Sequence, residues 1–171
     1  MPFINIAQPE IIEIEEGLRL KKFDGNLEKM VEGYHDPVVY QNSEGIFEEE
    51  KIPDYDYISG MCRYLDSVGE LYFIQVLENG EYVSVGDVTV KSENPPIAIW
   101  QGKYRGIGIG SKAMKAVIDR LSILGYEKIT GTSIFKWNIA SQKMHEKLGF
   151  CRVAETEDDY IYELKMQSPQ Q

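Results

Sequence analysis

A glycine-rich segment with the sequence YRGIGIGS, residues 104–111, constrains the fold of this 171-residue chain more than any other feature. It follows a short apolar stretch, Ile97 to Trp100, and it precedes a stretch with helical periodicity. Alternating glycines let the main chain turn tightly and let a ligand approach without a Cβ in the way. The first N–H groups of the following helix have no partner inside that helix and carry the positive end of its dipole. The segment therefore predicts a strand-to-helix turn that can hold an anion such as pyrophosphate.

The residues after the glycines alternate between helical and extended patterns. Apolar residues recur on one helical face after Ser111, and a capping asparagine followed later by a glycine marks the limits of a second helix. The elements predicted for this half are a helix from Ser111 to Gly125, a strand from Lys128 to Phe135, a helix from Asn138 to Lys147, and a hairpin of residues 150–154 and 160–166.

The residues before the glycines contain a clear hairpin signal at Asn79-Gly80, which lies between two apolar runs and tolerates positive φ. The region 37–57 is rich in Pro, Gly, Tyr and acidic residues and is predicted to be irregular, which is typical of a functional or mobile loop. The elements predicted for this half are a strand at 11–22, a helix at 26–34, a second helix at 58–68, and strands at 71–77, 82–90 and 97–100.

The order of these elements predicts an α+β fold in which helices pack on a mixed sheet. We expect one domain from residue 11 to residue 166, a flexible N-terminal segment at 1–10 and a flexible tail at 167–171.

Other glycine-rich motifs fit the letters less well. A dinucleotide-binding fingerprint, G-x-G-x-x-G, counted from Gly106 meets its third glycine one residue early, and counted from Gly108 it ends at Ala113. That permissive variant stays open, although it follows an antiparallel hairpin, where a Rossmann unit is not expected. A P-loop needs lysine directly after its last glycine, whereas Gly110 is followed by Ser-Lys. A plain tight turn is the remaining alternative.

Two motifs together resemble the GCN5-related N-acetyltransferase (GNAT) superfamily. The first is Arg105-x-x-Gly108-x-Gly110, which is similar to the family's Arg/Gln-x-x-Gly-x-Gly/Ala signature. The second is the sequence NIASQKMHEKLGF, residues 138–150, which is similar to the family's N-x-x-[AS]-x-x-[LM]-[YF]-E-K-L-G-F ending. The spacing of the two motifs also fits. Within the superfamily the chain is most similar to the ribosomal-protein and small-amine acetyltransferase branch, which also has a counterpart of the segment 35–39.

The resemblance implies a single-domain GNAT-like fold with about four helices and a twisted, mostly antiparallel sheet whose middle strands splay apart. It implies acetyl-CoA as co-substrate, with no metal, and a homodimer as one possible assembly. The backbone of the glycine turn would hold the pyrophosphate, and the edge of the strand near residue 100 would hydrogen-bond the pantetheine arm. The cofactor-binding residues implied in this way are Ile99, Trp100, Arg105, Gly106, Ile107, Gly108, Ile109, Gly110, Ser111, Asn138 and Ser141. For Asn138, a helix N-cap is an equally simple role.

Acetyl transfer to an amine needs a base for the amine proton and an acid for the departing thiolate. The family commonly places a tyrosine acid where this chain has His145, so His145 is the candidate acid, with plain packing beside the cofactor as the alternative. Asp87, inside the strand 82–90, is the candidate base, and Glu70 is a weaker one. Water alone is a further route for the proton.

The acceptor is expected to bind near the acidic loop 44–57, where acids stand among aromatic residues, a pattern that suits a cationic ligand. The candidate substrate-binding residues are Glu48, Glu49, Tyr55 and Tyr57. The acceptors considered are a polyamine, an aminoglycoside-like compound and a protein N-terminus. A solubilising acidic loop without a binding role is the alternative.

The charge of −10 argues against nucleic acid and anionic membranes as partners. The segment 101–150 nevertheless holds nine Lys and Arg against three acids, which leaves −16 on the remainder. Cys62 and Cys151 fit neither a disulfide framework nor a metal motif, and no signal peptide or membrane span is recognised, so we expect a cytoplasmic protein. The function expected is an acetyl-CoA-dependent N-acetyltransferase acting on a primary amine; a GNAT-fold module that binds acyl-CoA without turnover is the alternative.

Overall fold

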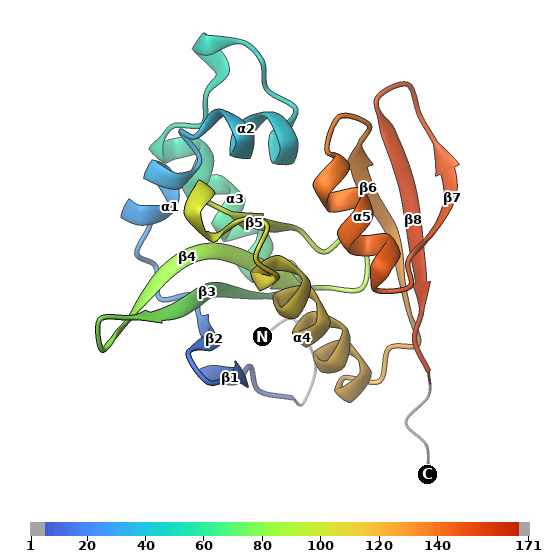
Figure 1. Ribbon diagram of the computed structural model, residues 1–171, viewed down its shortest axis with the longest axis horizontal. Coiled ribbons are helices and arrows are strands. Elements are labelled where there is room, and N and C mark those ends of the chain that lie inside the picture. The colour runs from blue at the N-terminus through green and yellow to red at the C-terminus, as the bar shows by residue number, and fades with distance from the viewer. Residues whose placement is uncertain (1–5, 168–171) are drawn as a thin grey trace.

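The computed structural model describes residues 6–167 and contains, in that range, eight strands and five α-helices (Figure 1). The strands are β1 (Ile11–Glu15), β2 (Leu18–Lys22), β3 (Glu70–Glu78), β4 (Glu81–Val90), β5 (Ile97–Ile99), β6 (Lys128–Phe135), β7 (Cys151–Glu155) and β8 (Asp159–Lys165). The α-helices are α1 (Glu28–Gly33), α2 (Pro37–Glu44), α3 (Tyr55–Val68), α4 (Ile109–Ile123) and α5 (Ile139–Lys147), and two 3₁₀ turns are η1 (Glu49–Lys51) and η2 (Gly102–Tyr104).

The strands form two antiparallel sheets that separate in the middle of the molecule. The first has the order β1-β2-β3-β4-β5 and the second has the order β6-β8-β7. Between the two sheets, the described residues make a single isolated parallel bridge, from Glu93 to Thr130. The expected α+β fold with splayed middle strands is therefore confirmed, and β5 presents its outer edge to the gap (Figure 1).

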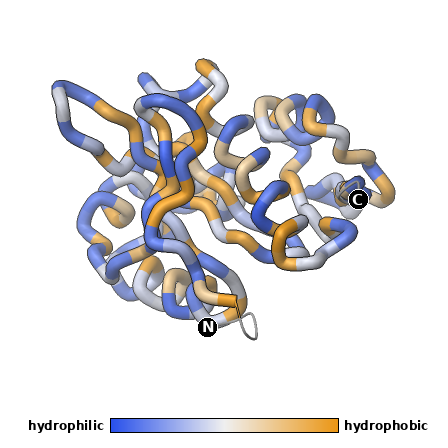
Figure 2. The backbone as a smooth tube through the Cα atoms, turned by 90° about the horizontal axis from the view of Figure 1, so that it is seen from below, coloured by the Kyte–Doolittle hydropathy of each residue, from blue (hydrophilic) through white to orange (hydrophobic). Residues whose placement is uncertain are grey.

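The side chains of β3 alternate between two hydrophobic clusters on opposite faces of the first sheet. Tyr72 and Ile74 belong to a cluster that includes α4, β6 and β8, whereas Leu71 and Phe73 belong to a cluster formed with α1 and α3. Hydrophilic and hydrophobic residues accordingly alternate along much of the chain (Figure 2). Helix α4 therefore covers one face of the first sheet and also packs against the second sheet, whereas α1 and α3 cover the other face of the first sheet.

A buried ion pair ties α4 to the start of β3. Glu70 is 1% exposed, and its two carboxylate oxygens accept hydrogen bonds from Arg120 at 2.8 and 2.7 Å. The hydroxyl of Tyr72 donates to the same carboxylate at 3.0 Å, and Arg120 also donates to the carbonyl of Ala7 at 3.1 Å. Because Glu70 has this partner, its burial needs no role in catalysis.

Two predicted segments differ from the structure. The prediction of one continuous strand at 11–22 is wrong. Gly17, with φ +80°, turns the chain there, and the two halves pair as the antiparallel strands β1 and β2. The irregular region predicted at 37–57 begins with helix α2. Asp36 caps that helix by accepting a hydrogen bond from the N–H of Val38 at 2.9 Å, and Gly45 ends it in the left-handed conformation.

The sequence predicts flexible ends at residues 1–10 and 167–171. Of these, residues 1–5 and 168–171 lie outside the described range. Within that range, the side chain of Gln8 donates to the carbonyl of Leu71 at 3.0 Å. No helix of residues 6–167 has the length and apolar character that crossing a bilayer requires.

Candidate active site

A cleft of about 390 Å³ opens where the two sheets separate. Its walls come from α2, from β5, from the glycine-rich turn and from α5, along that helix to its last residue, Lys147. Four segments that are distant in the sequence therefore meet at one opening, and the two motifs singled out in the sequence lie on neighbouring walls.

The glycine turn forms the floor of this cleft beside the start of α4. Gly106 and Gly108 have φ of +74° and +92°, a conformation that side chains other than glycine rarely adopt. Gly108 is the N-cap of α4, and no side chain caps the first N–H groups of the helix. The first residue of the helix to bond back to Gly108 is Lys112, at 3.0 Å. The N–H groups before Lys112 are therefore available to an anion.

The two isoleucines of the turn do not line the cleft. Ile107 is 62% exposed and is not among the residues that line the cleft, while Ile109, the first residue of α4, is buried in the core. Gly110 and Ser111 do line it. The turn thus offers backbone, rather than apolar side chains, to a ligand.

Arg105 acts as a brace inside the turn. Its Nε donates to the carbonyl of Ile99 at 3.0 Å, and one terminal nitrogen donates to the carbonyl of Trp100 at 3.1 Å and to the carboxylate of Asp36 at 3.0 Å. These contacts join the glycine turn to the end of β5 and to the start of α2. Most of the hydrogen-bonding capacity of Arg105 is therefore used within the protein.

The start of α5 contributes Asn138 and Ser141, and both line the cleft. Asn138 caps the helix, since its side-chain oxygen accepts from the N–H of Ser141 at 3.2 Å. Met144 lies one turn further on, and its sulfur is 3.3 Å from the position that a Cβ on Gly110 would take. Helix α5 consequently packs directly against the glycine turn.

His145, the residue expected as the acid, lies beneath the cleft wall rather than in it. Its side chain is 2% exposed, its Nδ1 is 2.7 Å from the carbonyl oxygen of Ser141, and its ring meets Phe150 edge to face. Burial lowers the pKa of this imidazole, which favours the neutral form. His145 itself does not line the cleft, but its Nδ1 also lies 3.2 Å from the hydroxyl oxygen of Ser141, a residue that does.

Asp87, the residue expected as the base, is 1% exposed and lies on β4 opposite Ala98 of β5, a residue that lines the cleft. Its carboxylate accepts hydrogen bonds from the Tyr34 hydroxyl at 3.0 Å and from the Trp100 indole at 2.7 Å. Burial raises the pKa of Asp87 to about 7, although both hydrogen bonds oppose this rise. The Trp100 side chain is thus buried against Asp87, and Trp100 is not among the residues that line the cleft.

The predicted substrate-binding residues do not converge on one point. Glu48 forms an exposed ion pair with Lys51, Glu49 lies in η1, and Tyr55 is exposed. Tyr57 donates a short hydrogen bond to Glu44, at the end of α2. Of the four, Tyr57 is the one that leads toward the cleft, because α2 forms one of its walls.

Sequence reasoning missed Glu44 and Tyr34. Burial raises the pKa of Glu44, and its negative charge in turn raises the pKa values of Tyr34 and Asp87. Glu44 and Asp87 thus interact electrostatically, and each carboxylate accepts a hydrogen bond from a tyrosine. We call these four residues, Tyr34, Glu44, Tyr57 and Asp87, the region behind α2. The Asp36-Pro37 start of α2, had it been recognised, would have indicated a helix that carries Glu44 to this place.

A cluster of aromatic rings links α2 to the segment between β6 and α5. The indole of Trp137 donates to the carbonyl of Gln41 at 3.0 Å. Its ring stacks on Phe135 at 4.6 Å and meets Phe47 edge to face at 5.2 Å between centroids. Helix α2 is therefore fastened to the second sheet across the gap.

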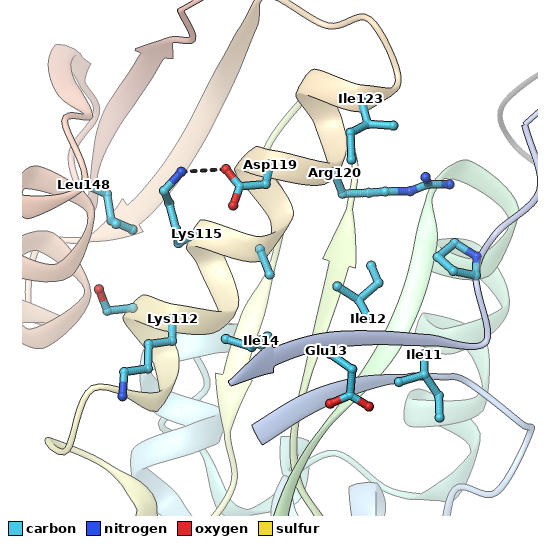
Figure 3. A pocket seen from close by; sticks show the side chains of 13 residues that line it. Ile11, Ile12, Glu13, Ile14, Lys112, Lys115, Asp119, Arg120, Ile123 and Leu148 are labelled. Carbon is cyan, nitrogen blue, oxygen red and sulfur yellow. Dashed lines mark hydrogen bonds and ion pairs between the residues drawn. The ribbon is translucent and has the colours of Figure 1, made fainter. Parts of the chain in front are cut away.

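A second hollow, of about 680 Å³, lies between β1 and the outer face of α4 (Figure 3). Isoleucines of β1 form one wall, and the basic residues of the other wall are already paired: Lys115 with Asp119, Arg120 with Glu70, and Lys112 with Glu15. Because the basic residues of this hollow are paired, it is less suited to an anion than the cleft between the sheets, which is therefore the candidate site.

Comparison with known proteins gives a consistent result. The model of the acetyltransferase (GNAT) family matches residues 37–150. A search of curated proteins gave no match. Among solved structures, a domain from Methanocaldococcus jannaschii aligns with a TM-score of 0.74 at 24% identity, covering 87% of this chain and 98% of that one.

Two further structures share the fold. An N-acetyltransferase from Staphylococcus aureus aligns with a TM-score of 0.64 at 21% identity, over 88% of this chain and 99% of that one. RimL, a ribosomal L7/L12 alpha-N-protein acetyltransferase in complex with coenzyme A, aligns with a TM-score of 0.71 at 13% identity, over 94% of this chain and 100% of that one.

Proposed function

Because the chain belongs to the acetyltransferase (GNAT) family, we propose that it transfers the acetyl group of acetyl-CoA to a primary amine. The observation that carries the proposal is the glycine turn at the start of α4, where unpaired backbone N–H groups open into the cleft beside the free edge of β5. The complex of RimL with coenzyme A, on a related fold, supports this choice of donor.

The residues that line the cleft suggest how such a donor would lie. The backbone from Gly106 to Ser111 would hold the pyrophosphate, and the outer edge of β5 would hydrogen-bond the pantetheine arm as an added strand does. Asn138 and Ser141 would lie along the same wall, and Arg105 would keep the turn fixed against β5. The bound donor supplies a thioester whose carbonyl carbon is attacked by the amine nitrogen, with cleavage of the C–S bond.

We assign the removal of the amine proton to Asp87. An amine is protonated at neutral pH, so a base with a pKa near the working pH is the most effective. The carboxylate of Asp87 has a pKa of about 7. Asp87 lies on β4, next to β5, which forms one wall of the cleft. Tyr34 and Trp100 orient it by donating to its oxygens.

We propose a cationic acceptor: a polyamine, an aminoglycoside-like compound or a protein N-terminus. What supports this is the group of carboxylates and tyrosines behind and beside α2, where Glu44 and Tyr57 are paired and Glu48 and Glu49 follow closely. A cation is attracted both by the carboxylates and by the faces of the aromatic rings.

The test of the proposed function is the release of free coenzyme A thiol from acetyl-CoA in the presence of an acceptor panel of polyamines, aminoglycosides and peptides with free N-termini. We expect release with one cationic class and none with the same compounds after N-acetylation. Binding of acetyl-CoA without thiol release from any acceptor would identify a binding module instead, and lack of binding would refute the proposal.

A matched pair of glycine variants tests the cofactor site. Gly108 and Gly125 both have φ +92°, and at both an added Cβ meets no atom closer than 4.0 Å. Gly108→Ala and Gly125→Ala should therefore lose similar stability, about 1 kcal/mol each. Only Gly108→Ala should weaken acetyl-CoA binding, by about tenfold or more, because its Cβ enters the space over the open N–H groups. Calorimetric titration measures the affinity and thermal unfolding the stability; equal affinities for the two variants would contradict this placement.

A further inference from the structure

The charge of the cleft is opposite to that of the protein. The chain carries 28 acidic residues and a net charge of −10, yet no Asp or Glu side chain lines the cleft, in the described part of the chain. Three cations do: Arg105, Lys143 and Lys147. A cleft from which carboxylates are absent on an acidic protein is suited to a polyanion.

Two of these three cations have no ion-pair partner among residues 6–167. Arg105 is held by Asp36 and by two backbone carbonyls. Lys143 and Lys147, in contrast, have no carboxylate of residues 6–167 within ion-pair distance, whereas Lys103, Lys115 and Lys136 each have one. Both side chains are exposed at the cleft wall, so their charges remain available to a ligand.

The lysines stand beside the glycine turn because of their place on α5. They are four residues apart and therefore share one face of the helix. Met144, which follows Lys143, packs against Gly110. The two exposed lysines therefore line the same cleft as the glycine turn, and β5 forms another of its walls.

Coenzyme A carries three phosphate groups, two in the pyrophosphate and one on the 3′-oxygen of the ribose. The open N–H groups and the helix dipole of α4 serve the pyrophosphate, and the pantetheine arm must run inward along β5. The nucleoside end would then leave the cleft beside α5, the helix that carries Lys143 and Lys147. A lysine ammonium on a flexible side chain is a suitable partner for the 3′-phosphate dianion.

Resting on the proposed function, we propose that Lys143 and Lys147 bind the 3′-phosphate of coenzyme A and make the enzyme select coenzyme A over its 3′-dephospho form. The selection uses charge rather than shape, so it weakens as salt increases.

The experiment compares the dissociation constants of coenzyme A and 3′-dephospho-coenzyme A for the wild type, for the double variant Lys143→Met/Lys147→Met, and for Lys115→Met. Lys115 lies on α4, pairs with Asp119 and does not line this cleft, so it controls for the loss of a lysine charge. Methionine keeps the length and apolar stem of the side chain, and all three positions are exposed, so folding is expected to be unaffected.

We expect the wild type and Lys115→Met to prefer coenzyme A by about tenfold or more, as hydrogen bonds to charged groups allow. The double variant should bind coenzyme A only as well as the dephospho form, whose own affinity should stay within about twofold of wild type. Equal weakening for both ligands would place the lysines on the pyrophosphate and overturn the proposal, as would an unchanged preference. If the wild type binds neither ligand, the proposed function itself fails.

Discussion

Replacing Arg120 with methionine is expected to lower the free energy of unfolding by about 3–5 kcal/mol. The guanidinium holds both carboxylate oxygens of Glu70, which is 1% exposed, so its removal leaves a buried charge with the hydroxyl of Tyr72 as the remaining donor. Urea denaturation followed by circular dichroism measures the change.

The double variant Glu70→Gln/Arg120→Met separates the lost contact from the stranded charge. Because it removes the carboxylate charge together with its partner, it should recover a large part of the stability that Arg120→Met loses. Lys115→Met, which breaks an exposed pair on the same helix, should change stability by less than about 1 kcal/mol. A double variant as unstable as Arg120→Met would show that packing of the arginine stem, and not the charge of Glu70, dominates.

Replacing Asp87 with asparagine is expected to lower kcat by about 100-fold or more at neutral pH, which is the lower end of what a general base contributes. The deficit should shrink as pH approaches the pKa of the acceptor amine, because the amine then loses its proton without help. A pH profile of kcat/KM from pH 6 to pH 10 measures this. A deficit that stays constant across the range would assign Asp87 a purely structural role.

Tyr34→Phe provides the companion measurement. The Tyr34 hydroxyl donates to Asp87 and so lowers the pKa that burial raises. Without that donor the pKa of Asp87 should rise further, and the acid limb of the profile should move to higher pH. An acid limb that does not move would mean that it reports a different group.

The same carboxylate makes stability depend on pH. The pKa of Asp87 is about 7 in the folded protein, above its ordinary value near 4, so the folded state binds this proton more tightly than the unfolded state does. The contribution of Asp87 to the free energy of unfolding is therefore largest below about pH 4. At most about 4 kcal/mol of this contribution is lost as the pH rises from about 4 through 7. Asp87→Asn removes this dependence. The variant should be more stable than the wild type at pH 8 while being less active.

The glycine turn and the α5 motif were predictable because the chemistry of each is local. Gly108 needs its φ of +92° whatever surrounds it, and Asn138 caps its helix through a bond to Ser141, three residues away. The family resemblance rested on these two motifs and is confirmed, and so is the α+β fold with separated middle strands.

Two local signals were read wrongly. The alternation of residues 11–22 continues through Glu16-Gly17, so the pattern of apolar residues conceals a turn that only the glycine marks. Asp36-Pro37 directly follows the helix predicted at 26–34, and an aspartate followed by proline also marks the start of a further helix. The strength of a capping signal does not reveal on which side of it the helix lies.

The region behind α2 could not be derived from sequence, because it depends on contacts between distant segments. Tyr34 meets Asp87 across 53 positions, and Glu44 meets Tyr57 only because α2 and α3 fold back on each other. Helical spacing likewise put His145 and Ser141 on one stripe, but spacing alone does not say whether a stripe faces the cleft or the core. The structure places the imidazole on the core side.

In the described part of the chain a single isolated bridge, between Glu93 and Thr130, joins the two sheets, so the outer edge of β5 has no partner strand. On the proposed function, the donor occupies the gap between β5 and β6 and completes the hydrogen bonding of the β5 edge. Acetyl-CoA at 100 times its Kd would add about 2.7 kcal/mol to the stability of the folded state. Because proteases remove unfolded chains, a cell with a high concentration of acetyl-CoA would keep more of this enzyme than a cell with a low one, at the same rate of synthesis. The abundance of the catalyst would then follow the supply of its own donor.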